Sequence, residues 1–331
     1  MSMFLCRLAR QLSIICATSL VVTFGPAKMA SAEEYPSGPI QILVAFAAGG
    51  GTDTFARLLA TPLSKILGRP VLVQNLPGGG GQVAATTLLR DGGDGLAILA
   101  TNEPDLFMST VFNTPPYKSS DFQAIMVDIL DPRIMLVQKT SGINSFDDFV
   151  ARAKAQPGKL AVSVTQGGAQ ELFAKWLFGK LGLDIRIVGY NGGGVAANAM
   201  LAGDVVAAVG DDFARLNIRD KSKALIIGSK AQSPRWPEAV TVKAALPPSI
   251  TIPSADFLAR YGIYVVPAAF KAKNPAAYKK LQQALIEARN TPEFQAYIAK
   301  NDLKDLSVGK PGEEFDAKFA EDFVEIAKLK H

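Results

Sequence analysis

The sequence has almost no residues of the kinds that carry most hydrolytic and metal chemistry. Its single histidine is His331, and its two cysteines, Cys6 and Cys16, lie near the N-terminus. A Ser-His-Asp or Cys-His catalytic system and a histidine-based metal site are therefore excluded. No Gly-x-Ser-x-Gly motif occurs, and although Ser307 and Lys310 match Ser-x-x-Lys, we expect them in a loop.

The N-terminal segment has the organisation of a secretory signal peptide. Arg7 and Arg10 precede an apolar run over residues 12–24, and Ala-Ser-Ala at 30–32 forms a small-residue cleavage site. The run is shorter than the roughly 20 residues that span a bilayer, and the bulky residues before Cys16 argue against a lipid anchor. We predict that residues 1–32 are removed, and both cysteines with them.

The charge balance offers no basis for nucleic-acid binding. Residues 1–32 hold three basic side chains and no acidic one, so 32 basic and 30 acidic side chains remain. The net charge falls from +5 to about +2, and no basic face with interleaved aromatic residues occurs. We therefore expect no nucleic-acid partner.

Two glycine clusters early in the chain each follow an apolar strand-like run and precede an amphipathic segment. The first is Gly49-Gly50-Gly51-Thr52-Asp53 and the second is Gly78-Gly79-Gly80-Gly81. A glycine turn that opens a helix leaves backbone N–H groups without intrahelical partners, and the helix dipole adds positive charge there. Two such turns within about thirty residues predict a shared anion-binding crevice.

The middle of the chain repeats this pattern, with glycine turns at 167–168 and 192–194. Strands alternating with helices predict parallel sheets, here in two α/β lobes with a cleft between them. We expect two strands around 124–127 and 134–137, a break at Asp131-Pro132 where the chain changes lobes, and a returning linker over 246–254. Three helices, beginning near Pro275, Thr291 and Glu313, are predicted to close the chain.

The remaining acidic residues leave one catalytic alternative. Asp53 and either Asp211 or Asp212 could face each other across the cleft as paired carboxylates. The structural interpretation is stronger, because Asp53 lies in a helix first turn, where the dipole favours a carboxylate. The residues therefore favour a binding protein over an enzyme, with no metal and no cofactor.

The glycine clusters and their surroundings resemble the solute receptors of tripartite tricarboxylate transporters, also called Bug receptors. The resemblance rests on the segments 44–53 and 75–81 and extends over nearly all of the chain after residue 32. Further matching segments are Gly93 to Leu99, Gly167 to Leu172, Gly189 to Gly194, Leu201 to Val205 and Arg260 to Pro267. Ala47, Gly93 and Val195 depart from the family pattern, each standing where the family has or often has proline.

The resemblance implies a two-lobed α/β periplasmic binding protein of type II, a Venus-flytrap fold with two interdomain crossovers. Lobe 1 would comprise residues 33–131 and 255–331, and lobe 2 residues 132–254. It implies that one carboxylate is held by backbone groups of the two lobe 1 glycine turns, and that lobe 2 sets specificity. The implied ligand-binding residues are Phe46, Ala48, Gly49, Gly50, Thr52, Asp53, Gly79, Gly80, Gly81, Thr101, Gln166, Gly168, Gln170, Tyr190, Asn191, Gly192, Gly193 and Asp211.

The resemblance also implies a small carboxylate as ligand and a periplasmic monomer that delivers it to integral-membrane transporter subunits. A ligand sensor that presents its bound state to a membrane signalling protein is the alternative. An enzyme of unrecognised type is the remaining possibility.

Overall fold

The computed structural model describes residues 34–112, 114–253 and 256–330. The predicted signal peptide, both cysteines and His331 lie outside these residues. The segment from Tyr35 onward forms one compact unit.

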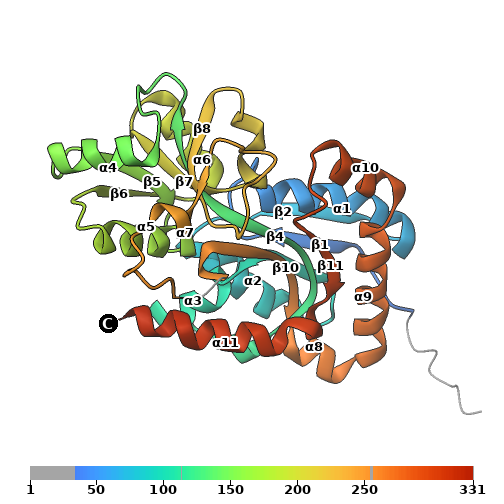
Figure 1. The fold of residues 1–331 in the computed structure, drawn as a ribbon. Coiled ribbons are helices and arrows are strands. Elements are labelled where there is room, and N and C mark those ends of the chain that lie inside the picture. The colour runs from blue at the N-terminus through green and yellow to red at the C-terminus, as the bar shows by residue number, and fades with distance from the viewer. Residues whose placement is uncertain (1–33, 113, 254–255, 331) are drawn as a thin grey trace, which may run out of the picture. The chain divides into compact units, whose positions relative to one another are not determined.

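Two sheets that share one long strand organise this unit (Figure 1). The first has the order β2-β1-β3-β10-β4, and β11 also pairs with β4. Its strands are β1 (Ile40–Val44), β2 (Val71–Asn75), β3 (Ala97–Glu103), β10 (Ala259–Pro267), β11 (Ser307–Pro311) and the first part of β4 (Phe122–Gln138). We call this sheet and its helices lobe 1.

The second sheet uses the last part of β4, which pairs with β7 and β8. Its strands are β5 (Ala161–Thr165), β6 (Arg186–Tyr190), β7 (Ala207–Asp211), β8 (Ser222–Ile227) and β9 (Val240–Thr241). We call this sheet and its helices lobe 2. The predicted parallel pairing holds for β1 with β2 and β3, and for β5 with β6 and β7. Strands β4, β10 and β11 pair antiparallel, so both sheets are mixed.

The helices connect the strands and cover the sheets. Those of lobe 1 are α1 (Gly51–Leu67), α2 (Gln82–Asp91), α3 (Asp105–Phe112), α8 (Ala268–Lys273), α9 (Pro275–Arg289), α10 (Pro292–Lys300) and α11 (Asp316–Ala327). Those of lobe 2 are α4 (Phe146–Ala155), α5 (Ala169–Lys180), α6 (Gly193–Ala202) and α7 (Val242–Ala245). The predicted terminal helices are thus α9, α10 and α11, with β11 as an unpredicted strand between the last two.

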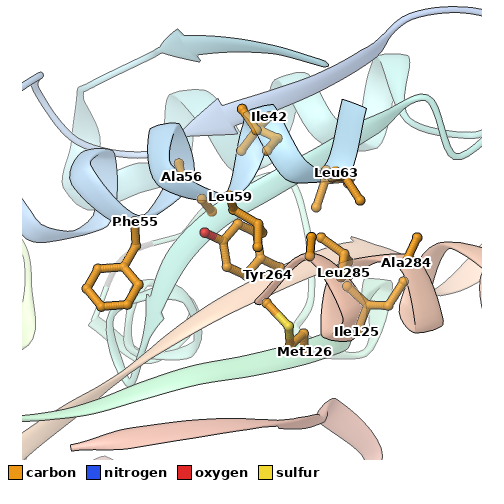
Figure 2. Close-up of a cluster of buried hydrophobic side chains, with 14 of the residues drawn as sticks. Ile42, Phe55, Ala56, Leu59, Leu63, Ile125, Met126, Tyr264, Ala284 and Leu285 are labelled. Carbon is orange, nitrogen blue, oxygen red and sulfur yellow. The ribbon is translucent and has the colours of Figure 1, made fainter. Parts of the chain in front are cut away.

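The core of lobe 1 forms where α1 and α9 pack over the sheet. Phe55, Leu59 and Leu63 recur along one face of α1 and are almost fully buried. In Figure 2, Leu59 lies next to Tyr264 of β10, Phe55 lies to the left of it, and Leu63 lies above Leu285 of α9. Because this face anchors α1, the N-terminus of the helix, and with it the glycine turn, has a fixed position.

Two predictions of secondary structure, one for β4 and one for its neighbour β11, were wrong. The expected pair around 124–127 and 134–137 is one continuous strand, β4, without a break at Asp131-Pro132. Its pairing with β10 ends at Pro132, and its pairing with β7 begins at Arg133. The missing N–H of proline therefore falls where one ladder ends and the next begins. Ser307 and Lys310, expected in a loop, lie in β11.

Candidate ligand-binding site

The first glycine turn connects β1 to α1. Helix α1 begins at Gly51, within the glycine cluster, and Asp53 lies in its first turn as predicted. Gly49 has φ +82°, a left-handed conformation that favours glycine, and its N–H donates to Asp53 Oδ2 at 2.9 Å. The carboxylate thus closes the turn, in which Gly49 is exposed, Gly50 is half-buried and Gly51 is buried.

The second carboxylate oxygen of Asp53 also accepts hydrogen bonds from groups of the protein. Oδ1 accepts from Asn75 Nδ2 at 2.9 Å and forms an ion pair with Arg57 at 3.0 Å. Asn75 also donates to the carbonyl of Phe46, which ties the end of β2 to the end of β1. Burial raises the pKa of Asp53, but the hydrogen bonds from Arg57, Gly49 and Asn75 outweigh it and hold the pKa below its usual value of 3.8.

Replacing Asp53 by asparagine should lower the free energy of unfolding by about 1.5 to 3 kcal/mol at pH 7, because hydrogen bonds to a charged acceptor are lost. Since the folded-state pKa is depressed, this contribution is complete above the usual value and is lost as pH falls through the folded pKa. Urea denaturation at pH 7 and pH 3 should show a smaller difference between wild type and variant at pH 3.

Binding measurements on the Asp53→Asn protein test whether Asp53 contacts the ligand. Calorimetric titration with a simple diacid should show little loss, because the Asp53 oxygens already face protein donors. A loss confined to an amino diacid would contradict this view and assign Asp53 to a ligand ammonium group. An equal stability difference at both pH values would contradict the electrostatic argument.

The second glycine turn lies over the carboxyl ends of the neighbouring strands. Gly78, Gly79, Gly80 and Gly81 have φ values of 137°, 58°, 65° and 99°, a run that side chains other than glycine rarely tolerate. A Cβ on Gly81 would lie 3.4 Å from Ala45 Cβ and 3.9 Å from Thr101 Oγ1. The turn therefore meets the ends of β1 and β3, where open α/β sheets bind ligands.

Lobe 2 presents two matching turns. The turn after β5 has Gly167 at φ +69° and leads through Gly168 into α5, and the turn after β6 leads through Gly192 into α6. The N–H of Gln166 donates to the carbonyl of Tyr190 at 2.8 Å, which holds the two turns side by side. Gln166 and Asn191 are exposed, whereas Tyr190 is half-buried.

The turns of the two lobes are in contact with each other. A Cβ on Gly80 would lie 2.8 Å from the carbonyl oxygen of Gly167, and one on Gly192 would lie 3.1 Å from the amide nitrogen of Ala47. Asp105 Oδ1 accepts a hydrogen bond from the N–H of Ala169 at 2.5 Å, joining the start of α3 to the start of α5. The glycine turns of lobe 1 and lobe 2 thus lie against one another.

Beside these contacts lies an open cleft of about 640 Å³, lined by residues that include Gly79, Gly80, Gln82, Gln166 and Gly167. Its walls come from the second glycine turn, the start of α2 and the end of α3 in lobe 1, and from the turn after β5 in lobe 2. The volume is within the range of small-molecule sites.

A buried charged network that the sequence did not predict lies behind the turns. Arg260 donates to Asp131 at 2.7 Å, Asp211 at 3.1 Å and Asn102 at 2.6 Å. Asp211 also pairs with Arg133 at 3.1 Å. Burial, together with nearby Asp211 and Asp212, raises the pKa of Asp131 to about 7, although Arg260 opposes the shift. The network spans both lobes, because Arg260 belongs to β10 and Asp211 to β7.

The predicted polar residues are largely engaged by the protein itself. Gln170 accepts from Thr165 Oγ1 at 2.8 Å and donates to Asp211 Oδ2 at 2.8 Å. Thr52 donates to Asn102 at 3.1 Å. Asp212 is held by Arg235 and Ser233, each at 2.7 Å. Each of Asp53, Asp211 and Asp212 therefore has its own set of partners, which gives the paired-carboxylate alternative no support.

The remaining predicted residues are placed around the same turns. Phe46 and Thr101 are buried, Ala48 and Gly49 are exposed, and Gly50 caps α1. Gly168 caps α5 with Asp105 against it, so that a Cβ there would lie 2.7 Å from Asp105 Oδ1. Gly193 begins α6.

Comparison with known proteins gives the family. Residues 55–328 match the TctC family, described as the tripartite tricarboxylate transporter family receptor. The chain belongs to this family. Protein BugT of Bordetella pertussis is 32% identical over 228 residues, which cover 67% of this chain and 70% of BugT.

Solved structures of similar proteins share the fold. MatC of Rhodopseudomonas palustris with bound malate superposes with a TM-score of 0.78 at 20% identity, covering 90% of this chain and all of MatC. The periplasmic binding protein BugD has a TM-score of 0.78 at 23% identity, covering 89% of this chain and 97% of BugD. The predicted α/β periplasmic binding protein fold is thereby confirmed.

Membership of the TctC family confirms two further predictions. The chain is a solute-binding receptor, and its family is not an enzyme family. In the part of the chain that the structure describes, no helix is both long enough and apolar enough to cross a bilayer.

Proposed function

We propose that this TctC receptor captures a small carboxylate between its lobes and delivers it to the integral-membrane subunits of a tripartite tricarboxylate transporter. The observation that carries the proposal is the meeting of four glycine turns, each at the N-terminus of a helix, where the two lobes are in contact. Helix N-termini supply unpaired N–H groups and a positive dipole, which an anion satisfies. The malate bound to MatC, a protein of the same fold, agrees with this chemistry.

The turns of lobe 1 are proposed to hold one carboxylate through backbone groups. Their own acidic residue, Asp53, is neutralised by Arg57 and its hydrogen bonds, so it repels an anion less than a free carboxylate would. The predicted residues of lobe 2, from the turns after β5 and β6, would then contact the rest of the ligand.

We also propose the lobe boundaries predicted above, residues 33–131 with 255–331 and residues 132–254. The change of partners within β4, between Pro132 and Arg133, supports the first crossover. The return to lobe 1 by β10 at Ala259 supports the second. Action in the periplasm after loss of residues 1–32 follows from the leader-like N-terminus, and BugD is described as periplasmic.

A thermal-shift screen with monoacids, diacids, triacids and amino diacids tests the ligand class. A ligand present at 100 times its Kd stabilises the folded state by about 2.7 kcal/mol. We expect at least one carboxylate to raise the midpoint temperature of unfolding in this way. The corresponding alcohols and amides, which lack the charge, serve as controls and should cause no shift. A protein stabilised by neutral compounds and by no carboxylate would contradict the proposal.

A further inference from the structure

Arg215 is a buried cation beside the candidate site that has no counter-charge of its own. It belongs to the 3-10 helix Phe213–Ile218 after β7 and is 2% exposed. Within the described residues its one hydrogen bond runs from Nη1 to the carbonyl of Ala214, and Nε is buried without a partner. An arginine stays protonated in a protein, so burying it without an anion is costly.

The nearby carboxylates are already paired with other arginines. Asp211 accepts from Arg133, Arg260 and Gln170, and Asp131 accepts from Arg260 and the N–H of Phe213. Burial lowers the pKa of Arg215, and Asp211 opposes the shift without forming an ion pair. An anion from outside the chain would complete this arrangement.

The guanidinium points to the start of α6. A Cβ on Gly193 would collide with Arg215 Nη2 and lie 3.6 Å from Thr165 Oγ1, and a Cβ on Gly210 would lie 2.8 Å from Arg215 Cγ. Gly193 does not have a left-handed backbone, so conformational freedom does not explain a glycine there. The absent side chain instead leaves the space that the arginine head occupies.

This position is on the lobe 2 side of the interlobe contact. Gly192 lies against Ala47 of the first glycine turn, and Ala214 lies against Gly51, with 2.9 Å from its Cβ to a Cβ built there. Arg215 directly follows Ala214, which contacts lobe 1, and its side chain approaches Gly193, which directly follows the other contact residue, Gly192. The first N–H groups of α6 have no intrahelical partner, and the guanidinium approaches Gly193, the first residue of this helix.

We propose that Arg215 and the N-terminus of α6 form the binding site for a second carboxylate of the ligand. The ligand would then be a diacid that is bound at both ends. The proposal rests on the proposed function, in which the lobe 1 turns hold the first carboxylate. A guanidinium binds a carboxylate through two parallel hydrogen bonds, and the helix N-terminus adds further donors. The acid group neutralises the buried charge, and this links ligand binding to closure of the lobes. Arg215 thereby determines specificity for diacids over monoacids.

Calorimetric titration with two matched pairs of acids tests this role. The pairs are succinate with butyrate and adipate with hexanoate, which differ mainly in the second carboxylate. In Arg215→Met, affinity for the bound diacid should fall about 10- to 100-fold more than affinity for its monoacid. Arg219→Met is the control. This substitution also removes one positive charge from lobe 2, but Arg219 has its own partner, Glu238, at 3.0 Å. The Arg219→Met protein should prefer diacids over monoacids as strongly as wild type does.

The unliganded proteins supply a second readout. Arg215→Met should unfold at the same temperature as wild type or higher, because an uncompensated buried charge has been removed. Equal loss of both acids, or a strongly destabilised variant, would show a structural arginine and overturn the proposal. A wild-type protein that binds the monoacids as tightly as the diacids would also overturn it. A wild-type protein that binds neither acid of either pair would instead count against the proposed function.

Discussion

Replacing Gly80 by valine should reduce affinity for the carboxylate ligand at least 100-fold, which corresponds to about 2.7 kcal/mol. Gly80 has φ +65°, a conformation that a β-branched residue adopts only with strain. Its Cβ would also lie 2.8 Å from the carbonyl oxygen of Gly167 and 3.1 Å from the carbonyl carbon. Both of these atoms belong to the backbone of the opposite lobe, so they cannot move aside cheaply. The substitution therefore distorts the anion-binding turn and blocks the approach of the lobes.

Titration calorimetry measures the affinity, and small-angle scattering measures whether ligand still compacts the protein. Gly179→Val is the matched control, because a Cβ on Gly179 in α5 meets no atom within 4 Å and its backbone is not left-handed. That variant should keep its affinity and its compaction. A folded Gly80→Val protein with unchanged affinity would show that the glycine turns are not the carboxylate site.

Asp211→Ala should lower the free energy of unfolding by about 3 to 5 kcal/mol, the cost of breaking a buried ion pair from one side. Asp211 is 3% exposed and pairs with Arg133 and Arg260, which are both buried. Its removal leaves Arg133 without its ion-pair partner and Arg260 with Asp131 alone. Because Arg133 and Arg260 lie on β4 and β10, the loss acts on both crossing strands at once.

Urea denaturation gives the stability change directly. Asp91→Ala is the control, since Asp91 pairs with Arg90 on the surface, and its urea midpoint should match that of wild type. The resemblance implied that Asp211 contacts the ligand. If that contact were its main role, stability would stay near wild type and only affinity would fall. That outcome would contradict the structural role assigned to the ion pairs.

The elements that could be predicted from the sequence are those with local signals. Ser145, followed by Asp147 and Asp148, is a local helix N-cap signal, and its hydroxyl accepts from the N–H of Asp148 at 3.0 Å. The starts of α2, α5 and α9 follow from glycine or proline and from helical spacing in the same short window. The glycine turns belong to this class, because strand, turn and helix are adjacent in the chain.

The missed features depend on partners far away in sequence. The extent of β10 from Ala259 was not predicted, since Arg260 and Gly262 interrupt the apolar pattern there, and both are buried only because β3 and β4 flank them. Arg260 and Asn102 lie 158 residues apart. Nothing near Arg215 in sequence signals its burial, which depends on the glycines at 193 and 210.

The position of β10 between β3 and β4 has a consequence for the order of folding. During synthesis, β3 and β4 are made long before β10. Until then β3 has one edge of unpaired N–H and C=O groups, and the lobe 1 part of β4 has two, because its other neighbour, β11, comes later still. Such edges pair readily with other extended chains, and pairing over long separations is slow. The strands of lobe 2 all emerge earlier. The nascent chain therefore passes through a stage in which all strands of lobe 2 are present while the lobe 1 sheet still lacks β10 and β11.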